Sequence, residues 1–504
     1  MSRKRLGGLV AGFAVAMLLA AATAGASVVT ISESGWVMAA KVSPDGTQVL
    51  TGSQSPDYTA RLWNASTGAL IRTFAGHTYY LTSVAFSPDG SQVLTGADDG
   101  TAKLWTTSTG SWIRTFTGHS SHVTSVAFSP DGTKVLTGSV DQTAKLWTTS
   151  TGAVIRTFTG HTNELSSVAF SPDGAQVLTG SVDQTAKLWT TATAALVRTF
   201  TGHTDIVRSA VFSPDGTKVL TGSDDHTAIL WNASTGAVIR TYTGHTNQVH
   251  GVAFSPDGNK VLTGSADHTA RLWSASSSTL LQTLTGHTDE IFPVAFSPDG
   301  ARVLTGSIDD TVRLETIPVP KGTIVINNNV TATNSTSATL ALTWSGGWGA
   351  GVVQMRFSDD GAHWTAWQPV AATAPHTLTA GDGYKTVRVQ FMDKLLIYSA
   401  VFSDYIRLDT VPPTGTIIIN NGAATTASSS VTLNLTYTDG TGSGVTRMRF
   451  SDNGSTWSAW ESVKATRAYT LPAGLGNHTV RVQYTDAASN YSPVYSDYIK
   501  VVAK

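Results

Sequence analysis

The chain has no cysteine among its 504 residues. Disulfides, thiolate metal sites and cysteine nucleophiles are therefore excluded, and the fold must be stabilised by the size and closure of its core. Charged residues are scarce, at 13%, and the formal net charge is −1. Because there is no basic excess and no charge run, the sequence predicts neither nucleic-acid binding nor a disordered tail.

Only one apolar run approaches the length that spans a membrane, and it lies at the N-terminus. Arg3, Lys4 and Arg5 precede an uncharged stretch over residues 6–22, and small residues at 24–26 offer a cleavage site. This pattern predicts a signal peptide over residues 1–26, with the mature protein periplasmic, secreted or at the cell surface and not inserted in a membrane. An uncleaved membrane anchor is the alternative interpretation.

Motifs for chemistry are also absent. The sequence contains no phosphate-binding loop, no HExxH and no Gly-x-Ser-x-Gly. We therefore expect no enzymatic activity, no cofactor and no metal centre.

A four-residue phrase, Ser-Pro-Asp-Gly, is repeated at nearly constant spacing. The first interval is 44 residues and the next five are 42. Each unit holds four short alternating segments separated by turns, for example 123–128, 134–138, 143–147 and 153–158. Four strands in a unit of this length predict a propeller blade. The phrase begins at Ser43, Ser87, Ser129, Ser171, Ser213, Ser255 and Ser297.

The repeats resemble WD repeats, the family of seven-bladed β-propellers. Gly-His opens six units and Leu-Trp closes six, while an aspartate precedes every third strand. The resemblance covers residues 27–316 and implies a closed ring in which the N-terminal strand 28–32 completes the last blade. The terminal units are atypical, with Glu33 at a histidine position and Glu315 at a tryptophan position.

The resemblance also implies a structural role for the most conspicuous polar residues. In the family, a histidine, a hydroxyl residue, an aspartate and a tryptophan form a hydrogen-bonded tetrad that braces each blade, here His119, Thr137, Asp141 and Trp147 in one unit. A histidine beside an aspartate could instead be a catalytic dyad. Such a dyad is needed once, whereas this pair recurs in blade after blade, so we interpret it as structural.

Two copies of a different module follow the repeats. Residues 322–410 and 415–501 match each other at a constant offset of 93. Alternating strands and Gly, Asn and Asp turns predict a β-sandwich in each copy, over 317–411 and 412–504, and the copies resemble immunoglobulin-like modules of exported bacterial proteins.

Each module carries two tryptophans three residues apart. This spacing on a strand would place the two rings on opposite faces, so one ring would be core and the other could stack on a sugar. The pairs are Trp364 with Trp367 and Trp457 with Trp460.

Positions that differ between blades indicate where a partner binds. The family presents them on one face around the ring opening. Apolar and aromatic residues at these positions concentrate in blades seven, one and two, which are adjacent in a closed ring, and they predict a surface for a protein partner. An alternative is that Trp36 and Phe292 pack beneath the closure seam. The predicted interaction residues are Trp36, Met38, Tyr80, Phe292 and Ile308, with Pro56 beside them.

The sequence as a whole predicts an all-β protein: a seven-bladed propeller with two tandem immunoglobulin-like sandwiches. The predicted function is an exported, non-enzymatic scaffold that binds a protein partner through the variable face of the propeller. The alternative is adhesion to a cell surface or to a glycan through the tryptophan-bearing sandwiches.

Overall fold

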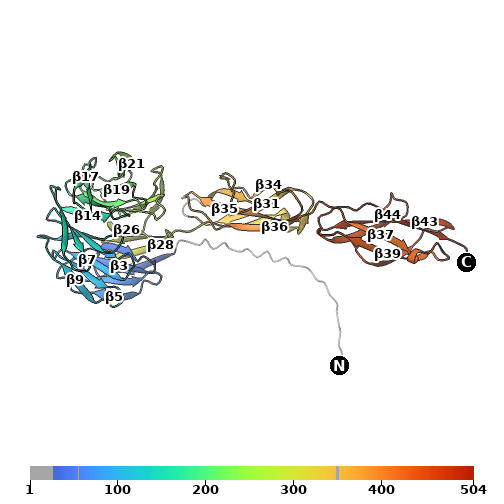
Figure 1. Ribbon diagram of the computed structural model, residues 1–504, viewed down its shortest axis with the longest axis horizontal. Helices are drawn as coiled ribbons and strands as arrows, with labels where there is room; N and C mark the ends of the chain where they lie inside the picture. The colour runs from blue at the N-terminus through green and yellow to red at the C-terminus, as the bar shows by residue number, and fades with distance from the viewer. Residues whose placement is uncertain (1–26, 55, 348–350, 395) are drawn as a thin grey trace, which may run out of the picture.

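The computed structural model describes residues 27–54, 56–347, 351–394 and 396–504. Figure 1 shows a propeller, coloured from blue to yellow, followed by two smaller β units in orange and red. The predicted signal peptide, residues 1–26, lies outside the described residues. In the described part of the chain, no helix has the length and apolarity needed to cross a membrane.

Seven four-stranded antiparallel sheets form the propeller, as the sequence predicts. Six of these sheets, blades one to six, use four consecutive strands each. They are β2 (Trp36–Val42), β3 (Gln48–Gln54), β4 (Ala60–Asn64) and β5 (Leu70–Phe74); β6 (Leu81–Phe86), β7 (Gln92–Ala97), β8 (Ala102–Thr106) and β9 (Trp112–Phe116); β10 (Val123–Phe128), β11 (Lys134–Ser139), β12 (Ala144–Thr148) and β13 (Val154–Phe158); β14 (Leu165–Phe170), β15 (Gln176–Ser181), β16 (Ala186–Thr190) and β17 (Leu196–Phe200); β18 (Val207–Phe212), β19 (Lys218–Ser223), β20 (Ala228–Asn232) and β21 (Val238–Tyr242); and β22 (Val249–Phe254), β23 (Lys260–Ser265), β24 (Ala270–Ser274) and β25 (Leu280–Leu284).

Blade seven joins the two ends of the repeat region. Its inner strands are β26 (Ile291–Phe296), β27 (Arg302–Ser307) and β28 (Thr311–Thr316), and its fourth strand is β1 (Val28–Ser32). β1 runs antiparallel to β28, with Val28 opposite Glu315 and Ser32 opposite Thr311. The ring is thereby closed by backbone pairing between segments almost 300 residues apart in sequence.

The repeated Ser-Pro-Asp-Gly phrase forms the turn between the first and second strands. In blade three, the Ser129 hydroxyl donates to Oδ1 of Asp131 at 2.5 Å, and the backbone N–H of Thr133 donates to the same oxygen at 3.0 Å. Gly132 adopts φ +69°, a left-handed conformation that glycine reaches without steric cost. The phrase therefore encodes the same hairpin in every blade.

Hydrophobic cores lie between neighbouring blades. One core combines Leu136 and Phe158 of blade three with Leu165, Val177 and Trp189 of blade four. Each sheet is thus covered by its neighbours, so a blade at an open end would expose an apolar face to water.

Each C-terminal unit contains a three-stranded and a five-stranded sheet. Their buried residues form one cluster in each unit, so the two sheets pack face to face. The strands of the first unit are β29 (Lys321–Ile326), β31 (Ser337–Ser345) and β34 (Thr373–Thr377) in one sheet, and β30 (Ala332–Thr333), β36 (Phe402–Leu408), β35 (Gly383–Asp393), β32 (Val352–Ser358) and β33 (Gln368–Pro369) in the other, with a 3-10 turn η1 (Asn327–Asn329).

The second unit repeats the first strand for strand. Its sheets are β37 (Thr414–Ile419), β39 (Ser430–Thr438) and β42 (Thr466–Thr470), and β38 (Thr425–Thr426), β44 (Tyr495–Val501), β43 (Gly476–Asp486), β40 (Val445–Ser451) and β41 (Glu461–Ser462), with η2 (Asn420–Gly422).

Closure makes a first prediction. Ile31 in β1 is only 1% exposed, whereas Thr30 beside it is exposed. Ile31→Ala should lower the free energy of unfolding by about 2–5 kcal/mol, because it leaves a cavity at the seam. Thr30→Ala is the matched control on the same strand and should change it by less than about 0.5 kcal/mol. Urea unfolding followed by tryptophan fluorescence measures both, and equal effects of the two changes would contradict a closed ring.

Candidate interaction face of the propeller

A chain of hydrogen bonds links four side chains across each of the central blades. In blade three, Nε1–H of Trp147 donates to Oγ1 of Thr137 at 2.9 Å, and that oxygen lies 2.7 Å from Nε2 of His119. Nδ1 of His119 lies 2.7 Å from Oδ2 of Asp141. The structure therefore brings together the four residues of the predicted tetrad. Equivalent chains occur in blades two, four, five and six.

The donor and acceptor of each hydrogen bond in this chain can be assigned. Because the Trp147 N–H can only donate, the Thr137 oxygen accepts from it, and the Thr137 hydroxyl donates to Nε2 of His119. Nδ1–H of His119 then donates to Asp141. Burial lowers the pKa of His119 and outweighs the opposing effect of Asp141, so the ring is neutral. Both ring nitrogens are thus engaged within the blade, and neither is left to act as a base.

In blade one, a glutamate takes the place of the histidine as acceptor for the threonine hydroxyl. Glu33 accepts the hydroxyl proton of Thr51, the role that the histidine ring has elsewhere. Its second carboxylate oxygen forms an ion pair with Arg61, which balances the buried charge. In blade seven, Nε of Arg313 donates to Glu315 at 3.2 Å. The two atypical blades are those joined at the seam.

One end of the propeller gathers the positions that vary between blades. We call it the upper rim; it comprises the loops at 33–36, 77–80, 119–122, 161–164, 203–206, 245–248 and 287–290 and the turns that precede each third strand. The Tyr80 carbonyl accepts the backbone N–H of Asp98 at 3.0 Å, and five further blades repeat this bond. Six of the seven loops are thereby held against the turn of their own blade. In the loop of blade one, the backbone N–H of Glu33 instead donates to the Asp310 carbonyl of blade seven at 2.8 Å.

The predicted interaction residues lie on blades seven, one and two, but they do not form one group. Trp36 begins β2 and exposes 53% of its surface. Met38 and Phe292 line the central cavity, and Ile308 is half-buried in the turn of blade seven. Phe292 stacks on His250 with 4.1 Å between ring centroids, which draws it toward blade six. The alternative that places Trp36 beneath the seam is wrong, because the ring is exposed.

Tyr80 belongs to an aromatic cluster that the sequence reasoning missed. Tyr58 stacks on Tyr79 with 5.9 Å between ring centroids and meets the edge of Tyr80 at 5.4 Å. Tyr79 also lies 6.5 Å from the ring of His122. The sequence did contain a sign of this cluster. The first repeat interval is two residues longer than the next five, and the extra residues lie between the second and third strands of blade one, next to Tyr58.

A second unpredicted cluster occupies the rim of blades five to seven. Arg208 donates to both carboxylate oxygens of Asp224 at 2.8 and 2.6 Å. Nε2 of the buried His250 lies 3.2 Å from Glu290. Burial lowers the pKa of His250 and outweighs the opposing hydrogen bond with Glu290. The upper rim therefore has an aromatic side and a charged side.

The structure corrects the prediction that the two tryptophans of each sandwich lie on opposite faces of a strand. Trp364 and Trp367 do not point to opposite faces of a strand. The guanidinium carbon of Arg356 lies over both rings, 4.8 and 4.6 Å from their centroids. The segment between them is irregular, so strand alternation does not apply. Tyr398 stacks on Trp367 at 5.5 Å, so both faces of that ring are covered. The second unit has the same ladder around Arg449.

Three carboxylates meet where the two sandwiches join. Oxygen atoms of Asp409, Asp439 and Asp486 all lie within 4.8 Å of one another, a grouping that could hold a metal ion. Burial raises the pKa of Asp439 and of Asp486. Asp409 accepts the backbone N–H of Ser443 at 2.6 Å, and Asp486 accepts the side-chain amide of Asn490 at 2.8 Å. Oδ1 of Asp439, by contrast, is buried without a hydrogen-bond partner among the described residues.

Comparison with known families agrees with this geometry. The chain matches the WD domain, G-beta repeat family over residues 25–64, 68–106, 110–148, 152–190, 194–232, 236–274 and 278–314. The chain therefore belongs to the WD-repeat family, whose propellers are generally non-enzymatic scaffolds for protein interaction. A search of curated proteins finds no match to the chain.

The central threonine makes the second prediction. Thr137→Val should lower the free energy of unfolding by about 1–3 kcal/mol, because it leaves the buried Trp147 N–H without a partner. Thr148→Val, which removes a hydroxyl outside the network on the neighbouring strand, is the matched control. Thermal unfolding measures both, and a network that braces the blade is contradicted if Thr137→Val is as mild as the control.

The same network predicts sensitivity to acid. The pKa values of His119, His161 and His287 lie below the ordinary 6.5 in the folded state, chiefly through burial, so the unfolded chain takes up these protons first. Their contribution to stability is complete above pH 6.5 and decreases as the pH falls below it.

Aspartates extend this loss to lower pH. Burial opposes ionisation of Asp141, but hydrogen bonds from Thr143 and His119 outweigh it and lower its pKa below 3.8. Its stabilising effect is therefore lost below pH 3.8. The denaturant midpoint should fall in both ranges, and a midpoint that stays constant from pH 7 to pH 5 would contradict the neutral histidines.

Proposed function

We propose that this protein is an exported, non-enzymatic scaffold that captures a protein partner on the upper rim of its propeller. Export is inferred from the pattern of residues 1–26. The observation that supports the binding site best is Trp36. Six of the other seven propeller tryptophans are buried with their N–H groups bonded to threonine, and Trp112 lies on an outer strand, whereas Trp36 exposes more than half its surface on the rim. Exposed aromatic rings beside an apolar surface are typical anchors of protein partners.

An aromatic cluster on the same rim supports the same role. Tyr58, Tyr79 and Tyr80 contact one another there. Tyrosine and tryptophan provide a large contact area at low entropic cost. Backbone hydrogen bonds hold the rim, within six of the blades and from Glu33 of blade one to Asp310 of blade seven, so little ordering accompanies binding.

The sandwiches act in this proposal as immunoglobulin-like spacers. Adhesion to a glycan is the alternative, and it requires an open aromatic face. The ladder of Tyr398, Trp367, Arg356 and Trp364 covers both faces of its inner indole, so it supports a structural role for these residues.

A substitution at Trp36 tests the proposed site. Trp36→Ala should reduce capture of envelope proteins by the immobilised protein at least tenfold, with no change in melting temperature, since hot-spot aromatics contribute about 2 kcal/mol or more. Trp112→Ala is the matched control: this ring is 59% exposed, but on the outer edge of blade two. If both variants retain the captured proteins, the rim at Trp36 is not the binding site.

A further inference from the structure

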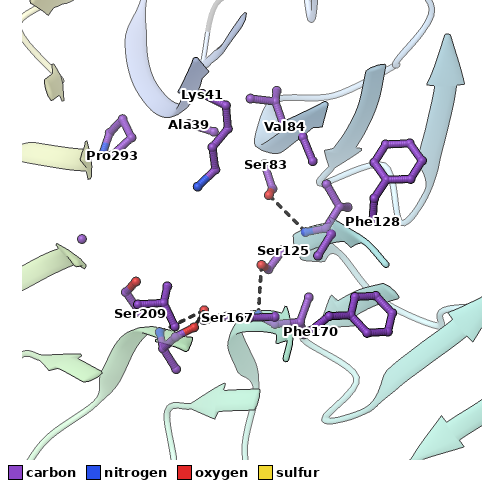
Figure 2. A pocket seen from close by; sticks show the side chains of 18 of the residues that line it. Ala39, Lys41, Ser83, Val84, Ser125, Phe128, Ser167, Phe170, Ser209 and Pro293 are labelled. Atoms are coloured by element: carbon purple, nitrogen blue, oxygen red, sulfur yellow. Dashed lines mark hydrogen bonds between the residues drawn. The ribbon is translucent and has the colours of Figure 1, made fainter. Parts of the chain in front are cut away.

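A cavity of about 650 Å³ lies at the centre of the propeller. The first strands of all seven blades line it, and Figure 2 shows side chains from blades one to five and seven around the opening. Its volume falls within the range of about 300–1,000 Å³ typical of small-molecule sites.

One position in this ring differs from its counterparts. Lys41 of β2 pairs with Leu50 in the register in which the other blades place a small apolar residue opposite a leucine. Figure 2 shows the Lys41 side chain extending from blade one into the cavity. The cation is thus not part of the repeated framework. The six counterparts are Ala85, Ala127, Ala169, Val211, Ala253 and Ala295.

The Lys41 ammonium has no counter-charge in the cavity. Among the described residues that line it, none is acidic, and Arg208, which lines the cavity from blade five, is already paired with Asp224. Solvent reaches Lys41 in the open cavity, and the surrounding protein lowers the pKa of its ammonium. The ammonium is therefore open to an anion that enters the cavity from solvent.

Serine hydroxyls around the cavity provide further donors. Ser83 accepts the backbone N–H of Val126 at 3.1 Å, and Ser125 accepts that of Val168 at 3.1 Å. Each hydroxyl therefore keeps its own proton to donate. Figure 2 shows these two serines in the wall of the cavity into which Lys41 extends.

We propose that the central cavity binds a small oxyanion, a carboxylate or a phosphate, with the Lys41 ammonium as its counter-charge and the serine hydroxyls as additional donors. The ligand enters from solvent, and binding needs no movement of the blades. This site is independent of the partner surface at Trp36.

Calorimetric titration of the purified protein with inorganic phosphate and with succinate, at constant ionic strength, tests this site. Lys41→Ala should weaken binding by about ten- to a hundredfold, as expected for the loss of a charge-assisted hydrogen bond. This variant inserts the residue that most other blades carry, so it should fold. Lys321→Ala, an exposed lysine outside the propeller, should leave binding unchanged.

The near-sevenfold symmetry allows a sharper experiment. In the double variant Lys41→Ala with Ala127→Lys, the cation moves to blade three at the same register, and anion binding should return. Absence of binding to the unaltered protein, or equal binding to Lys41→Ala, would overturn the proposal.

Partner capture separates this proposal from the function proposed above. Lys41→Ala should capture partners normally, and Trp36→Ala should bind the anion normally. If the unaltered protein binds neither probe while Lys41→Ala loses partner capture, Lys41 serves the partner surface and the anion site is wrong.

Discussion

The antiparallel pairing of β1 with β28 is the constraint on which the propeller depends. Hydrophobic cores lie between blades and not within them, so an open ring would leave apolar faces in water. The family repeats reflect this arrangement, because each matched segment combines the outer strand of one blade with the three inner strands of the next. The first repeat therefore contributes its outer strand to blade seven, and without cysteine the closure relies on backbone pairing and buried side chains.

Within this ring, the same chain of hydrogen bonds recurs in the central blades and occupies the polar atoms of its histidine, threonine and aspartate side chains. The Thr137 hydroxyl accepts a hydrogen bond from the Trp147 indole and donates one to the His119 imidazole, which in turn donates one to Asp141. A histidine and an aspartate in contact would suggest catalysis if they occurred once. The pair instead recurs in blade after blade with its hydrogen bonds made within the blade, which indicates a structural role. Blade one shows that the constraint is on acceptors and charge balance, since Glu33 and Arg61 replace the histidine.

Much of the fold could be predicted from the sequence because its determinants are local. Turn residues at fixed intervals and alternating apolar positions specify each hairpin, and the four observed strands of blade three lie within one residue of those expected. Prediction was poorer for the tryptophan pairs. Their spacing suggested opposite faces of a strand, but the backbone between Trp364 and Trp367 is irregular, and attraction to Arg356 places both rings on one guanidinium.

The sequence by itself determined the number of blades and the duplicated module that follows, because these depend on a constant separation along the chain, and the resemblance to WD repeats supplied the hydrogen-bonding partners of the central blades. Only the tertiary structure decided how variable residues combine across blades: Tyr58 with Tyr79, His250 with Phe292, and Lys41 in a central cavity with no acidic lining residue. The physical reason is that closing the ring brings side chains from distant repeats to one axis and one rim. The repeat pattern does not predict which of these side chains will contact one another, or which charged side chain will lack an ion-pair partner.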